Sequence, residues 1–134
     1  MTDEELMGLA LSLAAKGRGA TSPNPMVGAV LVRNDQIVGR GFHARAGEPH
    51  AEVVAIEEAG EAACGSTLYC TLEPCCHRGR TGPCVERILT AGVKAVVVGV
   101  EDPDPRVDGG GIRHLRERGV AVQVGVCRMK AQRL

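Results

Sequence analysis

The feature that most constrains this chain is a pair of short segments that together carry the ligands of one metal site. The first segment is Pro49-His50-Ala51-Glu52, and the second runs from Cys75 to Cys84. One imidazole and two thiolates are a ligand set that zinc accepts when its fourth position is left open for water. The fold must therefore bring His50 next to two cysteines from a later part of the chain.

Composition favours a small-molecule partner. At 134 residues the chain has the size of one domain and can bury a core of its own. Sixteen basic residues balance sixteen acidic ones, so no net field attracts nucleic acid or an anionic membrane. Phe42 and Tyr69 are the only aromatic residues, too few for a platform on which several bases stack.

The amino terminus and the cysteines together predict a cytoplasmic protein. The chain begins Met1-Thr2-Asp3-Glu4-Glu5, with acids where a secretion signal carries positive charge. Six cysteines in such a chain are expected to stay reduced rather than to form a disulfide framework. No apolar run approaches the ~18 residues of a membrane span, so a soluble protein with no membrane partner is expected.

Hydrophobic periodicity predicts an α/β fold. Helices are expected from Thr2 to about Lys16, from Pro49 onward, from Cys84 to Ala91 and from Ile112 to Arg118. Strands are expected at Val27 to Val32, Ile37 to Phe42, Thr67 to Thr71, Ala95 to Val100 and Val120 to Val126. The first two strands form a hairpin, whereas strands that alternate with helices pair in parallel. These patterns predict a mixed five-stranded sheet with helices on both faces.

Local signals add detail to this outline. Thr2 and Glu5 form a predicted capping box at the first helix. Gly28, Gly39 and Gly41 interrupt the first two strands, where they mark a close approach to a neighbouring helix or to a ligand.

Three cysteines and one histidine have interpretations of their own. We expect Cys64 and Cys70 to be small core residues rather than ligands. Cys84 lies in the first turn of a helix, where unpaired amides favour its thiolate. His43 enters a polar loop, where a lone histidine is more often solvated than functional, so it is kept as a weak candidate for substrate contact.

The spacing of His50 and Glu52 indicates deamination. In zinc deaminases a His and two Cys hold Zn²⁺, which lowers the pKa of a water toward ~7, and a Glu two residues after the His moves protons. Glu52 has this position. We expect it to take a proton from the water and to deliver protons to the ring nitrogen and the departing ammonia.

The second ligand segment departs from the usual spacing. The second Cys ordinarily follows the first by three residues, a position that Arg78 occupies here, so we assign that ligand to Cys84. The intervening segment carries His77, Arg78 and Arg80 beside the metal. Cationic donors at the mouth of a pocket predict a phosphate-bearing substrate.

Two other kinds of site could be formed by the same residues. A closed structural zinc site could take Cys76 or His77 as its fourth ligand, but it would leave Glu52 unexplained. A redox pair formed by Cys75 and Cys76 is disfavoured because neighbouring cysteines close a strained ring.

These motifs resemble those of the diaminohydroxyphosphoribosylaminopyrimidine deaminases of riboflavin biosynthesis. The resemblance covers essentially the whole chain, and its motifs are Thr21-Ser22-Pro23-Asn24-Pro25 with Val27-Gly28, then Pro49-His50-Ala51-Glu52-Val53, then Thr71-Leu72-Glu73-Pro74-Cys75-Cys76-His77 with Gly79, Arg80, Thr81 and Cys84. It implies a three-layer α/β/α fold of the cytidine deaminase type. It also implies Zn²⁺ on His50, Cys75 and Cys84, with Glu52 as proton donor.

The resemblance also implies a set of substrate contacts. These are Asn24, His43, His77, Arg80 and Thr81, joined by Asp102 and Asp104 in the loop after a buried strand. The chain departs from the family at two positions. Asp104 stands where the family usually has Asn, and Gly82 stands where it commonly has Pro.

The resemblance implies the reaction as well. The expected activity is hydrolytic deamination of the phosphoribosyl diaminopyrimidine to the aminouracil product and ammonia. In most of this family an NADPH-dependent reductase domain follows, and residues 1–134 are expected to be a single deaminase domain without it. The alternatives are a deaminase of another base, such as adenosine in transfer RNA, and a zinc-stabilised binding module. Association with a separate reductase and assembly into a homo-oligomer are both left open.

Overall fold

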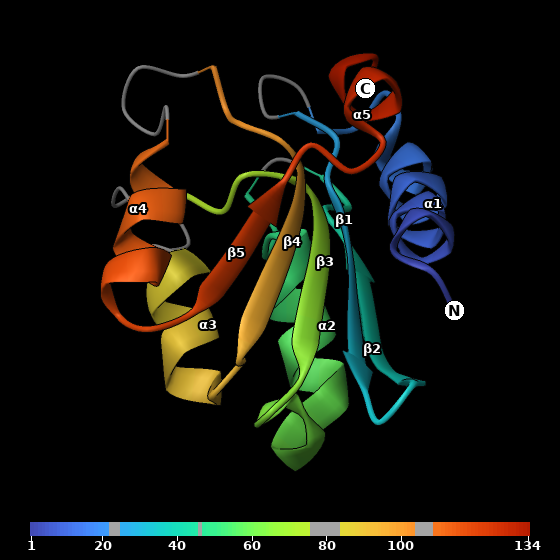
Figure 1. Cartoon of the computed structure of the whole chain (residues 1–134). Coiled ribbons are helices and arrows are strands. Elements are labelled where there is room, and N and C mark those ends of the chain that lie inside the picture. The colour runs from blue at the N-terminus through green and yellow to red at the C-terminus, as the bar shows by residue number, and fades with distance from the viewer. Residues whose placement is uncertain (22–24, 46, 76–83, 104–108) are drawn as a thin grey trace.

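A computed structural model gives the structure of the protein and describes residues 1–21, 25–45, 47–75, 84–103 and 109–134. Its centre is a five-stranded sheet in the order β2-β1-β3-β4-β5 (Figure 1). The strands are β1 (Gly28–Arg33), β2 (Gln36–Phe42), β3 (Thr67–Leu72), β4 (Ala95–Val100) and β5 (Ala121–Val124). β1 is antiparallel to both β2 and β3, whereas β3, β4 and β5 are parallel to one another. The predicted mixed sheet is confirmed.

Helices cover both faces of this sheet (Figure 1). They are α1 (Asp3–Ala14), α2 (Ala51–Ala59), α3 (Cys84–Ala91), α4 (Gly110–Glu117) and α5 (Arg128–Gln132), with 3₁₀ turns at Ala15–Gly17 and Gly60–Ala63. α1 and α5 lie on one face, and α2, α3 and α4 lie on the other. The capping box is present, since Thr2 Oγ1 accepts from the Glu5 amide and Glu5 Oε1 accepts from the Thr2 amide.

The last strand is shorter than predicted, and the helix after it was not predicted. β5 ends at Val124 because Gly125, at φ 103°, and Cys127, at φ 56°, turn the chain in left-handed conformations. The Gly125 amide still bonds to the Val98 carbonyl at 2.9 Å. α5 then has only five residues, too few for a periodic pattern to reveal.

The hairpin between β1 and β2 closes on two residues. Asn34 and Asp35 have φ values of 53° and 60°, the conformation of a two-residue turn that matches the twist of the strands. Asn and Asp tolerate this conformation better than most residues. The predicted hairpin is therefore confirmed.

Alternation along the strands divides the buried side chains between two cores. The run of valines in β4 shows this division, because Val96 and Val98 face α2, α3 and α4 while Val97 faces α1. A strand that is apolar on both faces is the expected result when helices cover both sides of a sheet.

Glycines in β1 and β2 let helices approach the sheet closely, as predicted. A Cβ at Gly28 would overlap the carbonyl oxygen of Ala10 in α1. A Cβ at Gly41 would overlap the carbonyl oxygen of Ala51, the first residue of α2. The amino end of α2 therefore rests directly on β2.

The prediction for Cys64 was wrong, whereas that for Cys70 is confirmed. Cys70 is fully buried in β3. Cys64 is exposed and lies against Gly92 in the turn before β3. Its position in a turn explains the error, because strand alternation no longer decides which way a side chain points.

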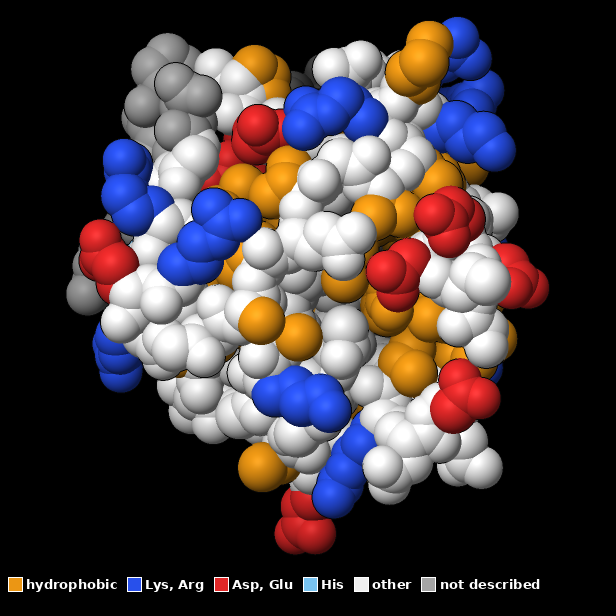
Figure 2. Space-filling model, viewed as in Figure 1, with side chains coloured by type: hydrophobic (Ala, Val, Ile, Leu, Met, Phe, Trp, Pro, Cys, Tyr) orange, Lys and Arg blue, Asp and Glu red, His pale blue; other side chains and the backbone are white. Residues whose placement is uncertain are grey.

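Charges of both signs share the molecular face seen in Figure 2. Acidic side chains gather over α1, whose first turn is Asp3, Glu4 and Glu5, and basic ones gather over α5. Neither sign covers this face. Within the part of the chain that the structure describes, no helix has both the length and the apolar character needed to cross a bilayer.

We expect Gly41→Ala to lower the free energy of unfolding by about 1 to 3 kcal/mol, because the added methyl pushes α2 away from β2. Gly8→Ala is the matched control, because a Cβ there meets nothing within 4 Å and Ala favours the helix by about 0.5 to 1 kcal/mol. Denaturant unfolding of both variants measures the difference. Equal stability of the two variants would contradict the close approach of α2.

Candidate metal centre and active site

Three elements bring the predicted metal ligands together. His50 is the N-cap residue of α2, Cys75 follows β3, and Cys84 begins α3. Nδ1 of His50 lies 3.1 Å from Sγ of Cys84 and 3.9 Å from Sγ of Cys75. The three ligand atoms all lie within 4.8 Å of one another. We call these three residues the ligand cluster.

Backbone contacts hold the two cysteine segments in register. The Val85 amide donates to the carbonyl oxygen of Cys75 at 3.1 Å. The Cys84 amide donates to Sγ of Cys75 at 3.4 Å. The first two amides of α3 therefore both bind Cys75, one at its sulfur and the other at its carbonyl oxygen.

This arrangement corrects the expectation that Cys84 is the favoured thiolate. A hydrogen bond from the Cys84 thiol, supported by His50, lowers the pKa of Cys75 to about 4. The same hydrogen bond and burial raise the pKa of Cys84. The thiol of Cys84 therefore donates its proton in a hydrogen bond to the sulfur of Cys75. A divalent cation would displace this proton and hold both sulfurs as thiolates.

Glu52 is buried beside the ligand cluster with one oxygen unpaired. Its side chain lies in the first turn of α2 and is 3% exposed. Its Oε1 is buried and has no hydrogen-bond partner among the residues that the structure describes. Burial raises the pKa of Glu52 to about 7. An unpaired carboxylate oxygen is costly to bury, so this oxygen fits a proton donor that enters the site, such as water.

The residues present therefore fit a zinc ion. One imidazole nitrogen and two thiolates suit zinc better than the hard cations, which prefer oxygen ligands. With three protein ligands, one position stays available for water, and the unpaired oxygen of Glu52 supplies an acceptor for it.

His43 is buried next to the ligand cluster, so the solvated interpretation was wrong. Its side chain is 2% exposed, and its ring meets that of His50 edge to face at a centroid distance of 5.1 Å. Its Nδ1 donates to the carbonyl oxygen of Pro49 at 3.3 Å. Burial lowers the pKa of His43, which favours the neutral ring. The loop folds back on α2, a tertiary contact that local sequence does not reveal.

Glu73 is a buried carboxylate to which the sequence analysis gave no role. It is 3% exposed and accepts hydrogen bonds from the amides of Asp102, Gly109 and Ile112, at 2.9 to 3.1 Å. The available signal was an acid at the end of an apolar strand, immediately before Pro74. Such an acid needs partners when it is buried.

Five of the seven predicted substrate contacts lie in segments that the structure does not describe. Asn24, His77, Arg80, Thr81 and Asp104 lie outside the described residues, as does Cys76, the other candidate for a fourth ligand. Asp102 is described and partly buried, and its amide is one of the three that donate to Glu73. The substrate contacts therefore remain predictions.

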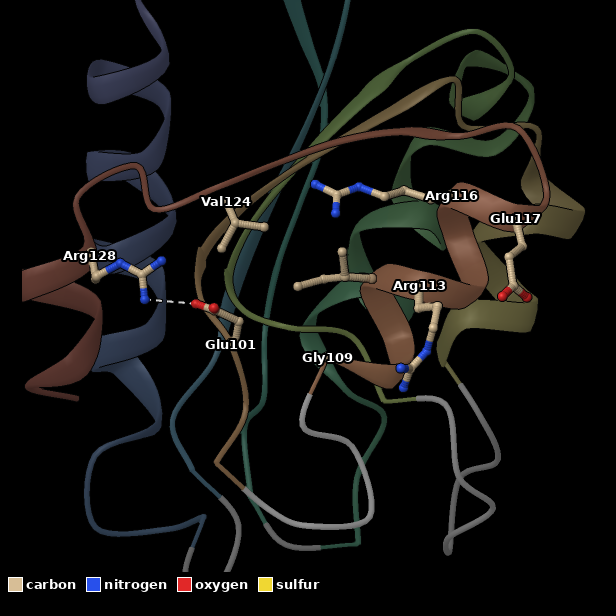
Figure 3. Close-up of a pocket in the computed structure, with 8 residues that line it drawn as sticks. Glu101, Gly109, Arg113, Arg116, Glu117, Val124 and Arg128 are labelled. Carbon is tan, nitrogen blue, oxygen red and sulfur yellow. Dashed lines mark hydrogen bonds and ion pairs between the residues drawn. The ribbon is translucent and has the colours of Figure 1, made fainter.

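A separate pocket of about 530 Å³ lies between α4, β5 and the start of α5 (Figure 3). Its charged groups are partly engaged with one another. Arg128 pairs with Glu101 at 2.7 Å, and Arg116 donates to the Val122 carbonyl at 2.9 Å. None of the ligand cluster lines this pocket, so it is distinct from the metal centre.

Comparison with known proteins identifies the family. The family described as "Cytidine and deoxycytidylate deaminase zinc-binding region" matches residues 1–100, a span that contains the ligand cluster and Glu52. The chain belongs to this family. The family is one of zinc-binding deaminases.

Two relatives show which members of the family the chain is similar to. The "Riboflavin biosynthesis protein RibD" of Aquifex aeolicus (strain VF5) is 54% identical over 132 residues, which are 98% of this chain and 37% of that protein. The "Diaminohydroxyphosphoribosylamino-pyrimidine deaminase" of Buchnera aphidicola subsp. Schizaphis graminum (strain Sg) is 46% identical over 133 residues, 99% of this chain and 90% of that protein. The chain thus spans little more than a third of the RibD relative and most of the Buchnera protein.

A solved structure supports the fold assignment. The diaminohydroxyphosphoribosylaminopyrimidine deaminase/5-amino-6-(5-phosphoribosylamino)uracil reductase of Thermotoga maritima matches with a TM-score of 0.92 and 43% identity. The match covers 98% of this chain and 38% of that one. The cytidine deaminase-like fold expected from the sequence is confirmed.

We expect His50→Ala and Cys84→Ala to lose most of the bound zinc, because each removes one of three ligands. Metal analysis of the purified variants tests this. Wild type should carry one zinc per chain. Cys64→Ala is the matched control for Cys84→Ala, since Cys64 is exposed and lies outside the ligand cluster. Full zinc content in both ligand variants would reject the assignment.

Proposed function

We propose that this protein hydrolyses diaminohydroxyphosphoribosylaminopyrimidine to 5-amino-6-(5-phosphoribosylamino)uracil and ammonia, a step of riboflavin biosynthesis. The observation that carries the chemistry is the buried Oε1 of Glu52, which lies beside the ligand cluster and has no hydrogen-bond partner among the described residues. The substrate rests on similarity, because a relative of nearly the same length has the name of this deaminase.

We assign the zinc to Nδ1 of His50 and to the two sulfurs of Cys75 and Cys84. When bound there, zinc supplies a Lewis acid that makes a water more acidic, with a pKa near ~7. The two thiolates partly neutralise the charge of the ion. His43 packs against the His50 ring and limits its movement.

Glu52 carries the protons in this proposal. The oxygen of the water forms the bond to the amine-bearing ring carbon, and its proton goes to the free Oε1. Glu52 passes that proton to the ring nitrogen and then delivers the second proton of the water to the amino group as the C–N bond breaks. A carboxylate with a pKa of about 7 can both accept and release protons at neutral pH.

The substrate is held by residues around this centre. We propose that Asp102, at the carboxyl end of β4, contacts the ribose or the phosphate, and that His43 lines the wall of the site. The remaining contacts proposed from the family resemblance are Asn24, His77, Arg80, Thr81 and Asp104. At Asp104 the chain has a carboxylate where the family usually has an amide, which is unfavourable beside a phosphate unless the side chain points away.

We propose that residues 1–134 act as one deaminase domain that works with a reductase. The RibD relatives are nearly three times the length of this chain, and the Thermotoga protein has both activities in its name. The reductase belongs either to the same polypeptide or to a separate one. We also propose that the reaction takes place in the cytoplasm, where the cysteines of the ligand cluster would stay reduced.

Two other functions are weaker. A deaminase of adenosine in transfer RNA would need a basic surface, whereas the formal net charge is zero and Figure 2 shows charges of both signs. A binding module with a structural zinc would gain nothing from burying Glu52 with an unpaired oxygen.

Glu52→Gln should keep its zinc and lose at least about 10²-fold in turnover, because an amide cannot accept the proton of the water. Ammonia release is measured in parallel with the diaminopyrimidine, cytidine and a transfer RNA anticodon stem. Glu57→Gln is the matched control, since Glu57 is on the same helix but exposed. Wild-type turnover by Glu52→Gln would remove the proton-transfer role, and release from cytidine or RNA alone would reject the substrate.

Arg80→Ala should weaken substrate binding by about 1.5 to 3 kcal/mol, as expected for the loss of a hydrogen bond to a charged group. Steady-state kinetics should show this loss for the phosphorylated substrate but not for its dephosphorylated analogue. Arg78→Ala is the control, because Gly79 separates the two arginines and we expect their side chains to point to opposite sides of an extended segment. Equal losses on both substrates would mean that Arg80 shapes the metal site rather than binding phosphate.

A further inference from the structure

Glu73 joins two segments of the chain that border the active site. Its own amide donates to the carbonyl oxygen of Val100, at the end of β4, at 3.0 Å. Its Oε1 accepts from the amides of Asp102 and Gly109, at 3.1 and 2.9 Å. The carboxylate thus binds both ends of the connection between β4 and α4.

The second oxygen of Glu73 caps α4. The N-cap residue of this helix is Gly109, which is left-handed at φ 83° and has no side chain with which to cap. Oε2 of Glu73 accepts from the amide of Ile112, the third residue after Gly109, at 3.1 Å. This is the amide that an N-cap side chain ordinarily binds. A residue from the end of β3 therefore does the work of a local cap.

Close packing at Gly111 is independent evidence that α4 contacts the segment of Glu73 and Pro74. A Cβ at Gly111 would overlap the carbonyl oxygen of Pro74 and would lie 3.4 Å from Cγ of Glu73. The first turn of α4 therefore rests on the two residues that precede Cys75. The position of α4 and the position of a metal ligand are coupled through three consecutive residues.

We propose that Glu73 is a positioning residue for substrate binding. It fixes Asp102 relative to Cys75, and so relative to the metal, without touching the substrate itself. The proposal rests on the proposed function, in which Asp102 contacts the substrate. Glu73 has no free acceptor to offer a ligand along its Oε1, which already binds two amides.

The variant Glu73→Gln should distinguish a role in substrate positioning from a general role in stability. The side-chain amide of Gln presents an N–H donor to at least one of the three backbone amides, so at least one hydrogen bond between residue 73 and the segment from β4 to α4 is lost. We expect KM to rise by about tenfold, kcat to stay within about threefold, and zinc content to stay at one per chain. Glu86→Gln is the matched control. Glu86 also contacts α4, through an exposed pair with His114, and its variant should leave KM unchanged.

Hydrogen exchange provides a readout that needs no turnover. In the wild-type protein the amides of Asp102, Gly109 and Ile112 should exchange slowly, and Glu73→Gln should speed all three by about tenfold or more. Should Glu73→Gln fail to fold, Gly111→Ala replaces it. That variant pushes α4 away from Pro74 and should raise KM with zinc retained.

Two results would overturn the proposal. One is rapid exchange of the three amides in the wild-type protein. The other is an unchanged KM, or a fall in kcat alone, in whichever of the two variants folds. Failure of the proposed function has a different signature, because the wild-type protein would then release no ammonia from the diaminopyrimidine while the exchange experiment still tested the Glu73 contacts.

Discussion

The site depends on the close approach of one imidazole and two sulfurs, which lie at the ends of α2, β3 and α3. Burial at this position raises the pKa of Glu52 to about 7 and also opposes ionisation of the two thiols. A divalent cation bound to these residues would offset this cost, because its charge favours both thiolates. Metal binding is therefore coupled to the stability of the ends of α2, β3 and α3.

The fold brings these ends together by means of close helix packing. Gly41 allows the first turn of α2 to lie on β2, which places His50 and Glu52 over the sheet. β3 pairs with β1 on one side and β4 on the other, so the segment that leaves it, with Cys75, emerges from the middle of the sheet. Amphipathic packing of α3 against the same core brings Cys84 to the sulfur of Cys75.

The sequence predicted the parts of this arrangement that have a local signal. Periodicity located all five strands and the first four helices, and the spacing of His50, Glu52, Cys75 and Cys84 indicated the ligand cluster and its acid. The parts that it missed depend on tertiary contacts. The burial of His43 depends on a loop that folds against α2, and the exposure of Cys64 depends on the direction of a turn. The short helix α5 follows two left-handed residues that no hydrophobic pattern reveals.

The two buried carboxylates show how the surroundings of a side chain decide its role. Both residues are 3% exposed, and each lies two positions from a metal ligand, Glu52 after His50 and Glu73 before Cys75. Glu73 accepts three backbone amides and is held in one place, which suits a residue that fixes geometry. Glu52 has an oxygen with no partner among the described residues, and burial raises its pKa to about 7, which suits a group that must gain and lose protons. If their hydrogen bonds were exchanged, Glu52 would be held as a permanent acceptor and would lose the protonation equilibrium that proton transfer requires. The different roles of the two carboxylates therefore depend on which of them accepts hydrogen bonds from backbone amides. One of the amides that bind Glu73 belongs to α4, a helix that contributes none of the metal ligands.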